Sequence, residues 1–477
     1  MPKSSRTAKD KKQKVAPVAG TTNNRKTKKK GRRPSASKDP TAGLQVTNPN
    51  AGAVDIGCAE HWAAVPPGRA EQTLRQFGCF TADLEAMANW FVKCRVDTVI
   101  LEATGNYWIV LYDLLEDRGL KPIVVNPRYA KNMSGKKGDI PDCQWMQRLH
   151  TYGLFANSFR PKEQLRILRS YLRQREVLTC AASQQIQHMQ HALTEMNVQL
   201  ANVIRDISGE TGLRIIDAIL AGQHDSQELA CLKDPRIRAT RQELAKALQG
   251  HWKEEQLFAL EQARLSYQHY QEQILQCDER IEKQMKVLES RLPGATEQQK
   301  TYEIKSTAKT PVLELRSELH RIIGVDLLKI PGVGPLTAQI VLSEIGTDMS
   351  HWPTEKHFAS WLGLCPDHRI SGGRILARST RPVVNRARNA LRIAVYSLER
   401  SKTGIGAKYR RLKSKLGAPK AIVAMAHHLA RLIYRMIKFG QDYVEKGMDA
   451  YNTKYKEQRI HWLRKQAREL GIQLMAA

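Results

Sequence analysis

The sequence lacks the features that mark three common classes of protein. No two of its eight cysteines stand at the C-x-x-C spacing of a structural zinc site. A chain of 477 residues can bury large cores without a disulfide framework, so we expect reduced thiols and a cytosolic protein. No apolar run approaches the roughly 18 residues of a membrane span. No apolar segment follows the basic N-terminus either, which argues against a secretory signal.

Acidic residues are also scarce relative to basic ones. The chain has 76 Lys and Arg against 47 Asp and Glu, which leaves a formal net charge of +29. A globular chain this basic usually binds a polyanion, because each phosphate that it neutralises releases counterions. We therefore expect a nucleic-acid partner. A membrane surface or a ribosome is the alternative.

The length predicts two or three domains, and the composition changes along the chain. Residues 1–48 are rich in Lys, Arg, Ser and Thr, which predicts a disordered tail that either solubilises the protein or binds phosphates. In residues 49–158, segments with the two-residue periodicity of strands alternate with segments that have helical periodicity. This pattern predicts an α/β domain with a mixed sheet. The expected strands are 53–57, 62–65, 97–102 and 121–125, and the expected helices are 84–94 and 107–118.

Helical periodicity dominates the rest of the chain. Residues 159–310 contain two long stretches without an internal break, 161–202 and 242–291, which predict antiparallel helices forming a coiled-coil arm with a structural or oligomeric role. The polar segment 293–311 predicts a linker. Residues 311–477 predict a mainly helical, basic domain that is interrupted by glycine turns and ends in an amphipathic helix.

Two acidic residues are associated with predicted strands. Asp55 lies in the first strand between Val54 and Ile56, and an acid among buried apolar neighbours is costly without a partner or a metal ion. Glu102 ends a β-branched run, and the carboxyl ends of strands form the usual functional edge of an α/β sheet. The alternative is that Glu102 ends a strand and has no further role.

Asp139 and Asp142 lie beside Pro141, which fits the first turn of a helix. Their spacing puts both carboxylates on one side of that helix. Each has a simpler interpretation, because Asp139 fits a helix cap and Asp142 fits a solvated charge in the first turn. Together with Asp55 and Glu102 they form an ordered set of oxygen donors. Such a set suits hard divalent cations and two-metal phosphoryl transfer.

The order of these motifs resembles the N-terminal half of IS110-family transposases. The matching segments are Val-Asp-Ile-Gly at 54–57, Leu-Glu-Ala-Thr-Gly at 101–105, Val-Val-Asn-Pro at 124–127 and Gly-Asp-Ile-Pro-Asp at 138–142. The resemblance implies a RuvC-like domain with the RNase H fold. It also implies a DEDD site of Asp55, Glu102, Asp139 and Asp142 that holds Mg²⁺ or Mn²⁺. Gly138 and Cys143 depart from the family's usual residues, and Cys-Gln-Trp at 143–145 is similar to the IS1111 branch.

Residues 327–338 resemble a helix-hairpin-helix. Gly332 and Gly334 would form the turn, and the amide groups at the start of the following helix could hold a DNA phosphate. The alternative is a glycine turn between two packed helices. A phosphate contact here would carry no sequence information.

Ser371 lies in a predicted flexible loop with Gly372 and Gly373. Cations flank it at Arg369, Arg374 and Arg378, and further arginines follow at 381, 386, 388 and 392. A serine that attacks a phosphodiester needs access for a bulky backbone, positive charge around the phosphorane and a route for its proton. The sequence suggests the first two and leaves the third open. From chemistry alone, phosphate binding without catalysis is the favoured interpretation.

The second set of motifs resembles the C-terminal transposase domain of the same IS110 family. It comprises, in order, Pro-Gly-Val-Gly at 331–334, Leu-Gly-Leu-Cys-Pro at 362–366, Ser-Gly-Gly at 371–373 and Asn-x-Leu-Arg at 389–392. The resemblance implies that Ser371 is a nucleophile forming a transient phosphoserine link to DNA. It also implies a guide, or bridge, RNA that selects double-stranded donor and target DNA. We expect a dimer or tetramer in which Ser371 comes from a neighbouring subunit.

Three functions are therefore compatible with the sequence. The first is a transposase or recombinase that uses the four carboxylates and Ser371. The second is a RuvC-type nuclease that uses the same carboxylates and water, and it would keep cutting after Ser371→Ala. The third is a non-catalytic nucleic-acid-binding protein, which would be unaffected by Asp55→Asn.

Overall fold

The computed structural model describes residues 41, 43–103, 105–126, 142–155, 157–292, 315–381, 383–440, 443 and 447–471, apart from the side chains of 369, 377–379 and 448. The predicted tail over 1–48 and the predicted linker over 293–311 lie largely outside these residues. So does Asp139. The chain divides into two compact units, residues 1–158 (the N-terminal unit) and 159–477 (the C-terminal unit).

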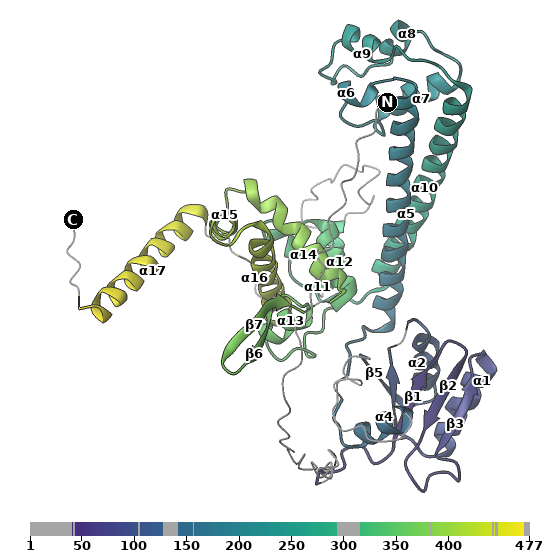
Figure 1. Cartoon of the computed structure of the whole chain (residues 1–477), viewed down its shortest axis with the longest axis vertical. Helices are drawn as coiled ribbons and strands as arrows, with labels where there is room; N and C mark the ends of the chain where they lie inside the picture. The colour runs from purple at the N-terminus through teal and green to yellow at the C-terminus, as the bar shows by residue number, and fades with distance from the viewer. Residues whose placement is uncertain are drawn as a thin grey trace, which may run out of the picture. The chain divides into compact units, whose positions relative to one another are not determined.

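The N-terminal unit is built on a mixed five-stranded sheet (Figure 1). Its strand order is β3-β2-β1-β4-β5, with β1 antiparallel to β2 and parallel to β4. The predicted α/β character of this region is confirmed. One strand was not predicted, because this edge strand carries Arg75 and Gln76 and shows no apolar alternation. The strands are β1 (Ala51–Ile56), β2 (Glu60–Ala64), β3 (Leu74–Gly78), β4 (Thr98–Glu102) and β5 (Lys121–Val125).

Alternating residues of β1 and β4 enter two different cores. Val54 and Leu101 pack against α1 (Thr81–Lys93) and α2 (Trp108–Asp117). Ala53 and Ile100 face the other way and pack with residues of α4 (Asp142–Thr151). Successive strand residues point to opposite faces, so Asp55 and Glu102 belong to the face that α4 covers.

Two long helices, α5 (Glu163–Glu195) and α10 (Glu254–Val287), run side by side in the C-terminal unit (Figure 1). A buried ion pair between Arg175 and Asp278, 2.5 Å from Nε to Oδ1, joins them. Four short helices lie at one end of the pair and share a core with it: α6 (Leu200–Val203), α7 (Glu210–Leu220), α8 (Ser226–Cys231) and α9 (Arg241–Ala247). The expected continuous helix over 242–291 is wrong in its first part, where α9 ends before α10 begins. Supercoiling of the two helices stays a prediction.

The remainder is mainly helical, as expected, and its helices before α17 share one core. Its helices are α11 (Leu315–Ile323), η1 (Leu327–Lys329), α12 (Pro335–Ile345), α13 (Glu355–Trp361), α14 (Arg386–Tyr396), η2 (Ser397–Arg400), α15 (Gly404–Leu416), α16 (Ala418–Phe439) and α17 (Gly447–Glu469). One hairpin interrupts them, formed by β6 (Pro366–Ser371) and β7 (Arg374–Thr380). Within the described residues, no helix has the length and apolar character needed to cross a membrane.

Candidate active site

Asp55 and Glu102 occupy equivalent positions on neighbouring strands. β1 and β4 run parallel with Val54 opposite Leu101, and each acid is the next residue of its strand. Both side chains therefore lie on the same face, on strands that are about 4.8 Å apart. Glu102 is only 9% exposed, whereas Asp55 is partly exposed. The sheet thus brings these two carboxylates together at the carboxyl ends of β1 and β4.

Helix α4 approaches the same end of the sheet. Near its start, the Cys143 thiol donates to the carbonyl oxygen of Trp62 at 2.9 Å and to that of Ala53 at 3.4 Å. One turn later, Gln147 Nε2 donates to the carbonyl of Ala51 at 3.0 Å. The helix therefore runs opposite to β1, and its first residue, Asp142, is at the end nearer Asp55. Asp142 is exposed.

The negative charge of Asp55 affects the pKa of two buried side chains, Cys143 and His61. Burial raises the pKa of the Cys143 thiol, and the negative charge of Asp55 raises it further. Burial lowers the pKa of His61, an effect that Asp55 opposes. The His61 Nδ1 atom is buried without a hydrogen-bond partner among the described residues. His61 was not predicted as part of the site, because a lone histidine in a strand has no distinguishing pattern.

The described carboxylates are hard oxygen donors of the kind that Mg²⁺ and Mn²⁺ prefer. Within the described ranges, no three His, Cys, Asp or Glu residues are close enough together to hold a metal ion. Asp139 lies outside those ranges, so the predicted set of four is not tested. What the described residues supply is a pair, Asp55 and Glu102, with the start of α4 directed toward them.

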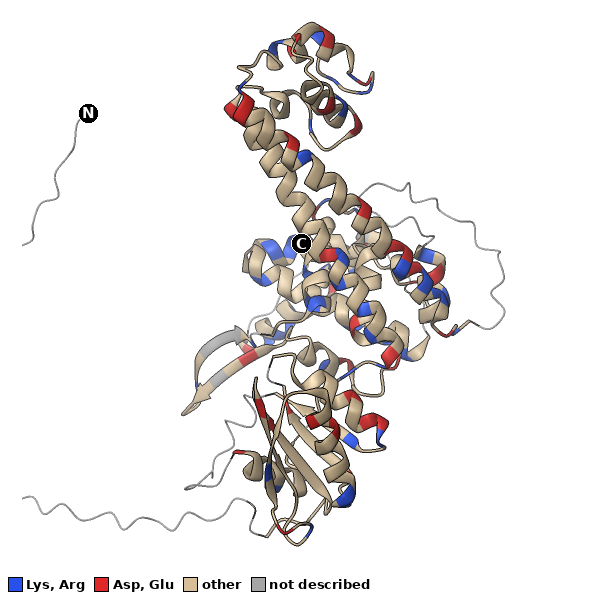
Figure 2. Cartoon of the chain, turned by 90° about the vertical axis from the view of Figure 1, so that its right-hand side faces the viewer, with Lys and Arg blue, Asp and Glu red and all other residues tan. Residues whose placement is uncertain are grey.

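The β6–β7 hairpin extends away from the helices of its unit (Figure 2), and Ser371, the last residue of β6, lies at its tip. It pairs with Arg374, and Gly372 and Gly373 between them have φ angles of 53° and 76°. A two-residue type I′ turn requires a positive φ at both central residues. The expectation of a flexible loop is therefore wrong, because the glycines form a tight turn between paired strands. Ser371 and Arg374 are both exposed.

Several arginines that were expected to surround Ser371 have structural partners instead. Arg388 donates to the carbonyls of Arg381 and Val383 at 3.4 and 3.1 Å, and to Thr380 Oγ1 at 3.3 Å. The Arg381 guanidinium donates to the carbonyl of Ser360 at 2.5 Å, which joins this segment to α13. Arg386 pairs with Glu176 on α5. Arg381 and Arg388 therefore fix the base of the hairpin rather than its tip. The side chains of Arg369 and Arg378 lie outside the described set.

The glycines of the predicted helix-hairpin-helix differ in their surroundings. Gly332 has a φ of 90°, and a Cβ there would lie 2.9 Å from Leu398 Cδ2 and 3.0 Å from the Ala394 carbonyl oxygen. Gly332 is therefore needed for close packing against α14 and η2. Gly334 precedes α12, and a Cβ there would meet open space. Phosphate binding at this turn stays a prediction that concerns Gly334 and the first amides of α12.

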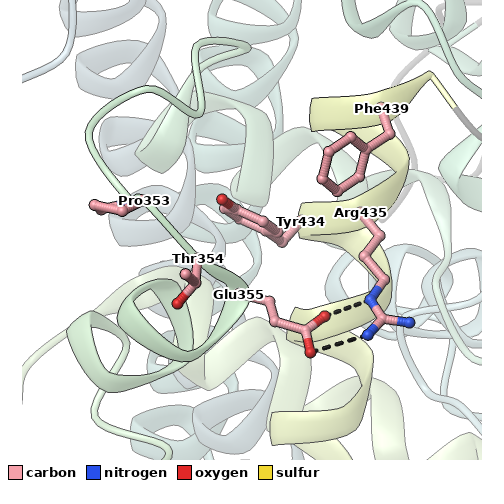
Figure 3. A pocket seen from close by; sticks show the side chains of 6 residues that line it. All are labelled: Pro353, Thr354, Glu355, Tyr434, Arg435 and Phe439. Atoms are coloured by element: carbon pink, nitrogen blue, oxygen red, sulfur yellow. Dashed lines mark hydrogen bonds and ion pairs between the residues drawn. The ribbon is translucent and has the colours of Figure 1, made fainter.

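A shallow pocket of the C-terminal unit involves groups that are already paired (Figure 3). Glu355 accepts hydrogen bonds from Arg431 Nε at 2.8 Å and Arg435 Nη2 at 3.0 Å, which holds α13 against α16. Tyr434 donates to the carbonyl of Trp352 at 2.7 Å. We interpret this pocket as a junction between helices. It is lined by Pro353, Thr354, Glu355, Tyr434, Arg435 and Phe439.

Two protein-family models match the chain. A DEDD-type model described as a transposase covers residues 53–198, which include all four predicted metal-binding acids. A model described as the transposase IS116/IS110/IS902 family covers residues 326–410, which include the glycine turn and Ser371. A search of curated proteins found no match. The two models fall on the two segments whose geometry is described above.

Proposed function

We propose that this chain, which belongs to the IS110 family of transposases and therefore cuts and rejoins DNA, does so through a covalent link between Ser371 and DNA. The observation that carries the proposal is the position of Ser371, exposed at the closing pair of a tight hairpin inside the matched transposase segment. An exposed tip suits a hydroxyl group that must reach the phosphorus atom of a bulky DNA backbone.

The proposed step is a transesterification. Ser371 Oγ forms a bond to phosphorus while the bond from phosphorus to the 3′ oxygen breaks, and the hydroxyl proton ends on that leaving oxygen. The link preserves the energy of the phosphodiester, so a second 3′ hydroxyl can reverse the step without ATP. Arg374, paired with Ser371 across the turn, would stabilise the charge on the phosphorane.

Asp55, Glu102, Asp139 and Asp142 would hold Mg²⁺ or Mn²⁺, and the DEDD-type match supports dependence on a divalent metal. A bound ion would act as a Lewis acid toward the phosphate. The chain's own contribution is to position the donors. The sheet sets the spacing of Asp55 and Glu102, and the thiol contacts of Cys143 hold the start of α4 against β1 and β2. Asp139 joins the set on the family resemblance alone.

We further propose double-stranded donor and target DNA as substrates and a guide RNA as the selector. The net charge of +29 supports polyanionic partners without distinguishing DNA from RNA. We expect a homo-oligomer in which Ser371 and the acids of one reaction come from different subunits. A mixture of Asp55→Asn and Ser371→Ala proteins should then recover activity that neither protein has alone.

A covalent-adduct assay tests the central proposal. The full-length protein is incubated with Mg²⁺, labelled DNA carrying an end of the element and RNA transcribed from the element's flanks, and the products are separated on a denaturing gel. We expect a labelled protein band with the wild type and with Ser350→Ala, an exposed serine elsewhere in the same unit. We expect no such band with Ser371→Ala.

The other outcomes are equally informative. Cut DNA without an adduct in the wild type would support a water-using nuclease of the RuvC type. An adduct that survives Ser371→Ala would assign the nucleophile to another residue. Loss of cutting after removal of divalent metal ions, with recovery on adding Mg²⁺ or Mn²⁺, would support the role of the four acids.

A further inference from the structure

The tip of the β6–β7 hairpin carries large apolar side chains that nothing in the described part of the chain covers. Ile370 is 62% exposed, Ile375 is 41% exposed and Leu376 is 70% exposed. Turn and hairpin tips more commonly carry small or polar residues. Three such side chains around the closing pair of one turn indicate a surface that is buried only when a partner is bound.

The strand register is irregular beside the turn, because Arg369 pairs with Ala377 and Ile370 with Ile375, which leaves Leu376 at a register shift. Ile370 pairs with Ile375, so these two share one face of the hairpin. Ser371 pairs with Arg374, and Leu376 lies two residues further along β7. Faces do not alternate regularly across such a shift, so the register assigns Leu376 to neither face. Two residues of chain span at most about 7 Å, which keeps Leu376 near Arg374, the partner of Ser371. Leu376 is thus a close apolar neighbour of the proposed nucleophile.

The base of the hairpin is fixed although its tip is bare. Arg388 and Arg381 bind the carbonyls and hydroxyl described above, which ties β7 and the following turn to α13 and α14. A two-stranded hairpin is marginally stable by itself, so these contacts are needed to hold it extended. An apolar tip on a fixed support can enter a partner without first being ordered.

The charge of the surrounding segment identifies the class of partner. Residues 366–398, which include the whole hairpin, contain seven arginines and one acid, Asp367, and one of the arginines, Arg386, is paired with Glu176 of α5. A surface that combines positive charge with bare apolar side chains is complementary to double-stranded DNA, whose phosphates are anionic and whose stacked bases are apolar. A protein partner covering the same apolar tip would have to supply acidic residues to the same segment.

We propose that Leu376 inserts between adjacent base pairs of double-stranded DNA, beside the phosphate that Ser371 attacks. Apolar wedges of this kind unstack a base step and kink the duplex. The kink would open the backbone to the hydroxyl of Ser371, which lies at the same hairpin turn as Leu376. The insertion stands independently of the proposed nucleophile. Only its location beside the attacked phosphate rests on the proposed function.

A binding comparison tests the insertion without requiring catalysis. The probes are two 30-base-pair duplexes of identical flanking sequence, one fully paired and one with a two-base central mismatch, each with 2-aminopurine beside the centre. Full-length protein is titrated in EDTA. Since a mismatch removes much of the unstacking penalty, we expect wild type to bind the mismatched duplex about tenfold more tightly. Binding of the paired duplex should raise 2-aminopurine fluorescence.

The variants separate a wedge from a general loss of apolar surface. Leu376→Ser should reduce the mismatch preference to about one and abolish the fluorescence rise. Leu265→Ser makes the same change on α10 at a side chain that is 55% exposed, and it should retain both signals. Leu376→Met should also retain them, because it remains apolar. Circular dichroism melting of each variant checks that the fold is intact.

Each remaining outcome supports or overturns the insertion. Ser371→Ala should keep the mismatch preference, so a failed adduct assay leaves this result standing. No preference in the wild type, or an unchanged preference in Leu376→Ser, would overturn it. So would a change in oligomer size in Leu376→Ser, measured by sedimentation, with the preference intact, because the tip would then cover a second copy of the chain.

Discussion

The two candidate parts of the active site differ in how the fold supports them. Asp55 and Glu102 lie on a five-stranded sheet with apolar cores on both faces. Ser371 lies on a two-stranded hairpin whose tip is bare. The acids are therefore positioned before any substrate arrives. The serine is held at the end of a support whose apolar surface is complete only with a partner.

The two sites also differ in the free energy that it costs to place their polar groups. Placing carboxylates at a covered sheet face is costly, because desolvation disfavours the charged form. An exposed serine carries no such penalty. We therefore expect the carboxylates of the acid site to lower the stability of the fold while they support catalysis. We expect the reactivity of Ser371 to depend on the geometry of the hairpin turn. Each prediction below tests one side of this contrast.

The largest effect is expected from removing a strand carboxylate. Asp55→Asn or Glu102→Gln should reduce DNA cutting on the order of a thousandfold, since a missing ligand removes several kcal/mol of stabilisation of the transition state. The melting temperature of Asp55→Asn should stay the same or rise, because a charge is removed from a covered face. Cutting assays and melting curves check this, with the exposed Glu116→Gln of α2 as a control that should change neither. A large fall in melting temperature would make the acids structural.

The packing of α4 against the sheet is expected to become less stable as the pH falls. Burial lowers the pKa of His150 to about 4, and its Nε2 lies 3.1 Å from Thr98 Oγ1 on β4. In the unfolded chain a histidine titrates near 6.5, so the unfolded state takes up the proton first as pH falls. The stability contributed by neutral His150 is complete above about pH 6.5. It falls by up to about 1.4 kcal/mol per pH unit down to about pH 4.

Hydrogen exchange on the full chain between pH 7 and 5, corrected for intrinsic rates, measures this effect. Protection of α4 and β4 should decrease toward pH 5 in the wild type and much less in His150→Gln. Peptides from the β6–β7 hairpin serve as the internal reference, because none of this effect should reach them. An equal decrease in the variant would assign the pH dependence to another group.

The sequence predicted the sheet much better than the hairpin, for a physical reason. Strands such as Thr98–Glu102 are buried on both faces, and their β-branched apolar runs are visible without knowing the fold. The hairpin strands carry arginines beside bare Ile370 and Leu376, so they show no alternation between buried and exposed positions. The glycines at 372 and 373 predicted a turn, but not that paired strands continue on both sides of it.

The candidate site shows the same limit. Asp55 and Glu102 were identified because acids stand out in apolar strands. Their closeness needed the parallel register of β1 and β4, which no local pattern specifies. Cys143 was treated only as a departure from the usual family residue, whereas its thiol is one of the contacts between α4 and the sheet. Contacts between residues about 80–90 positions apart cannot be read from the neighbours of either residue.

A smaller effect is expected from changing the turn beside Ser371. Gly372→Asn should preserve the hairpin, because Asn followed by Gly suits a type I′ turn. Gly372→Val should slow adduct formation about tenfold, because a left-handed conformation costs a β-branched residue roughly 1–2 kcal/mol. The initial rate of adduct formation in both variants checks this. Equal rates for Asn and Val would mean that the turn geometry does not position Ser371.

The smallest effect is expected at Cys143. Its thiol is buried, donates to the Trp62 carbonyl and has a raised pKa, so very little thiolate is present near neutral pH. N-ethylmaleimide should label the exposed Cys58, Cys79, Cys180 and Cys231 while leaving Cys143 unmodified until the protein is unfolded, as mass spectrometry of the α4 peptide would record. Fast labelling of Cys143 would mean that the first turn of α4 opens readily. The carboxylate site would then, like the apolar hairpin tip, be completed only when a partner binds, and the contrast between the two would disappear.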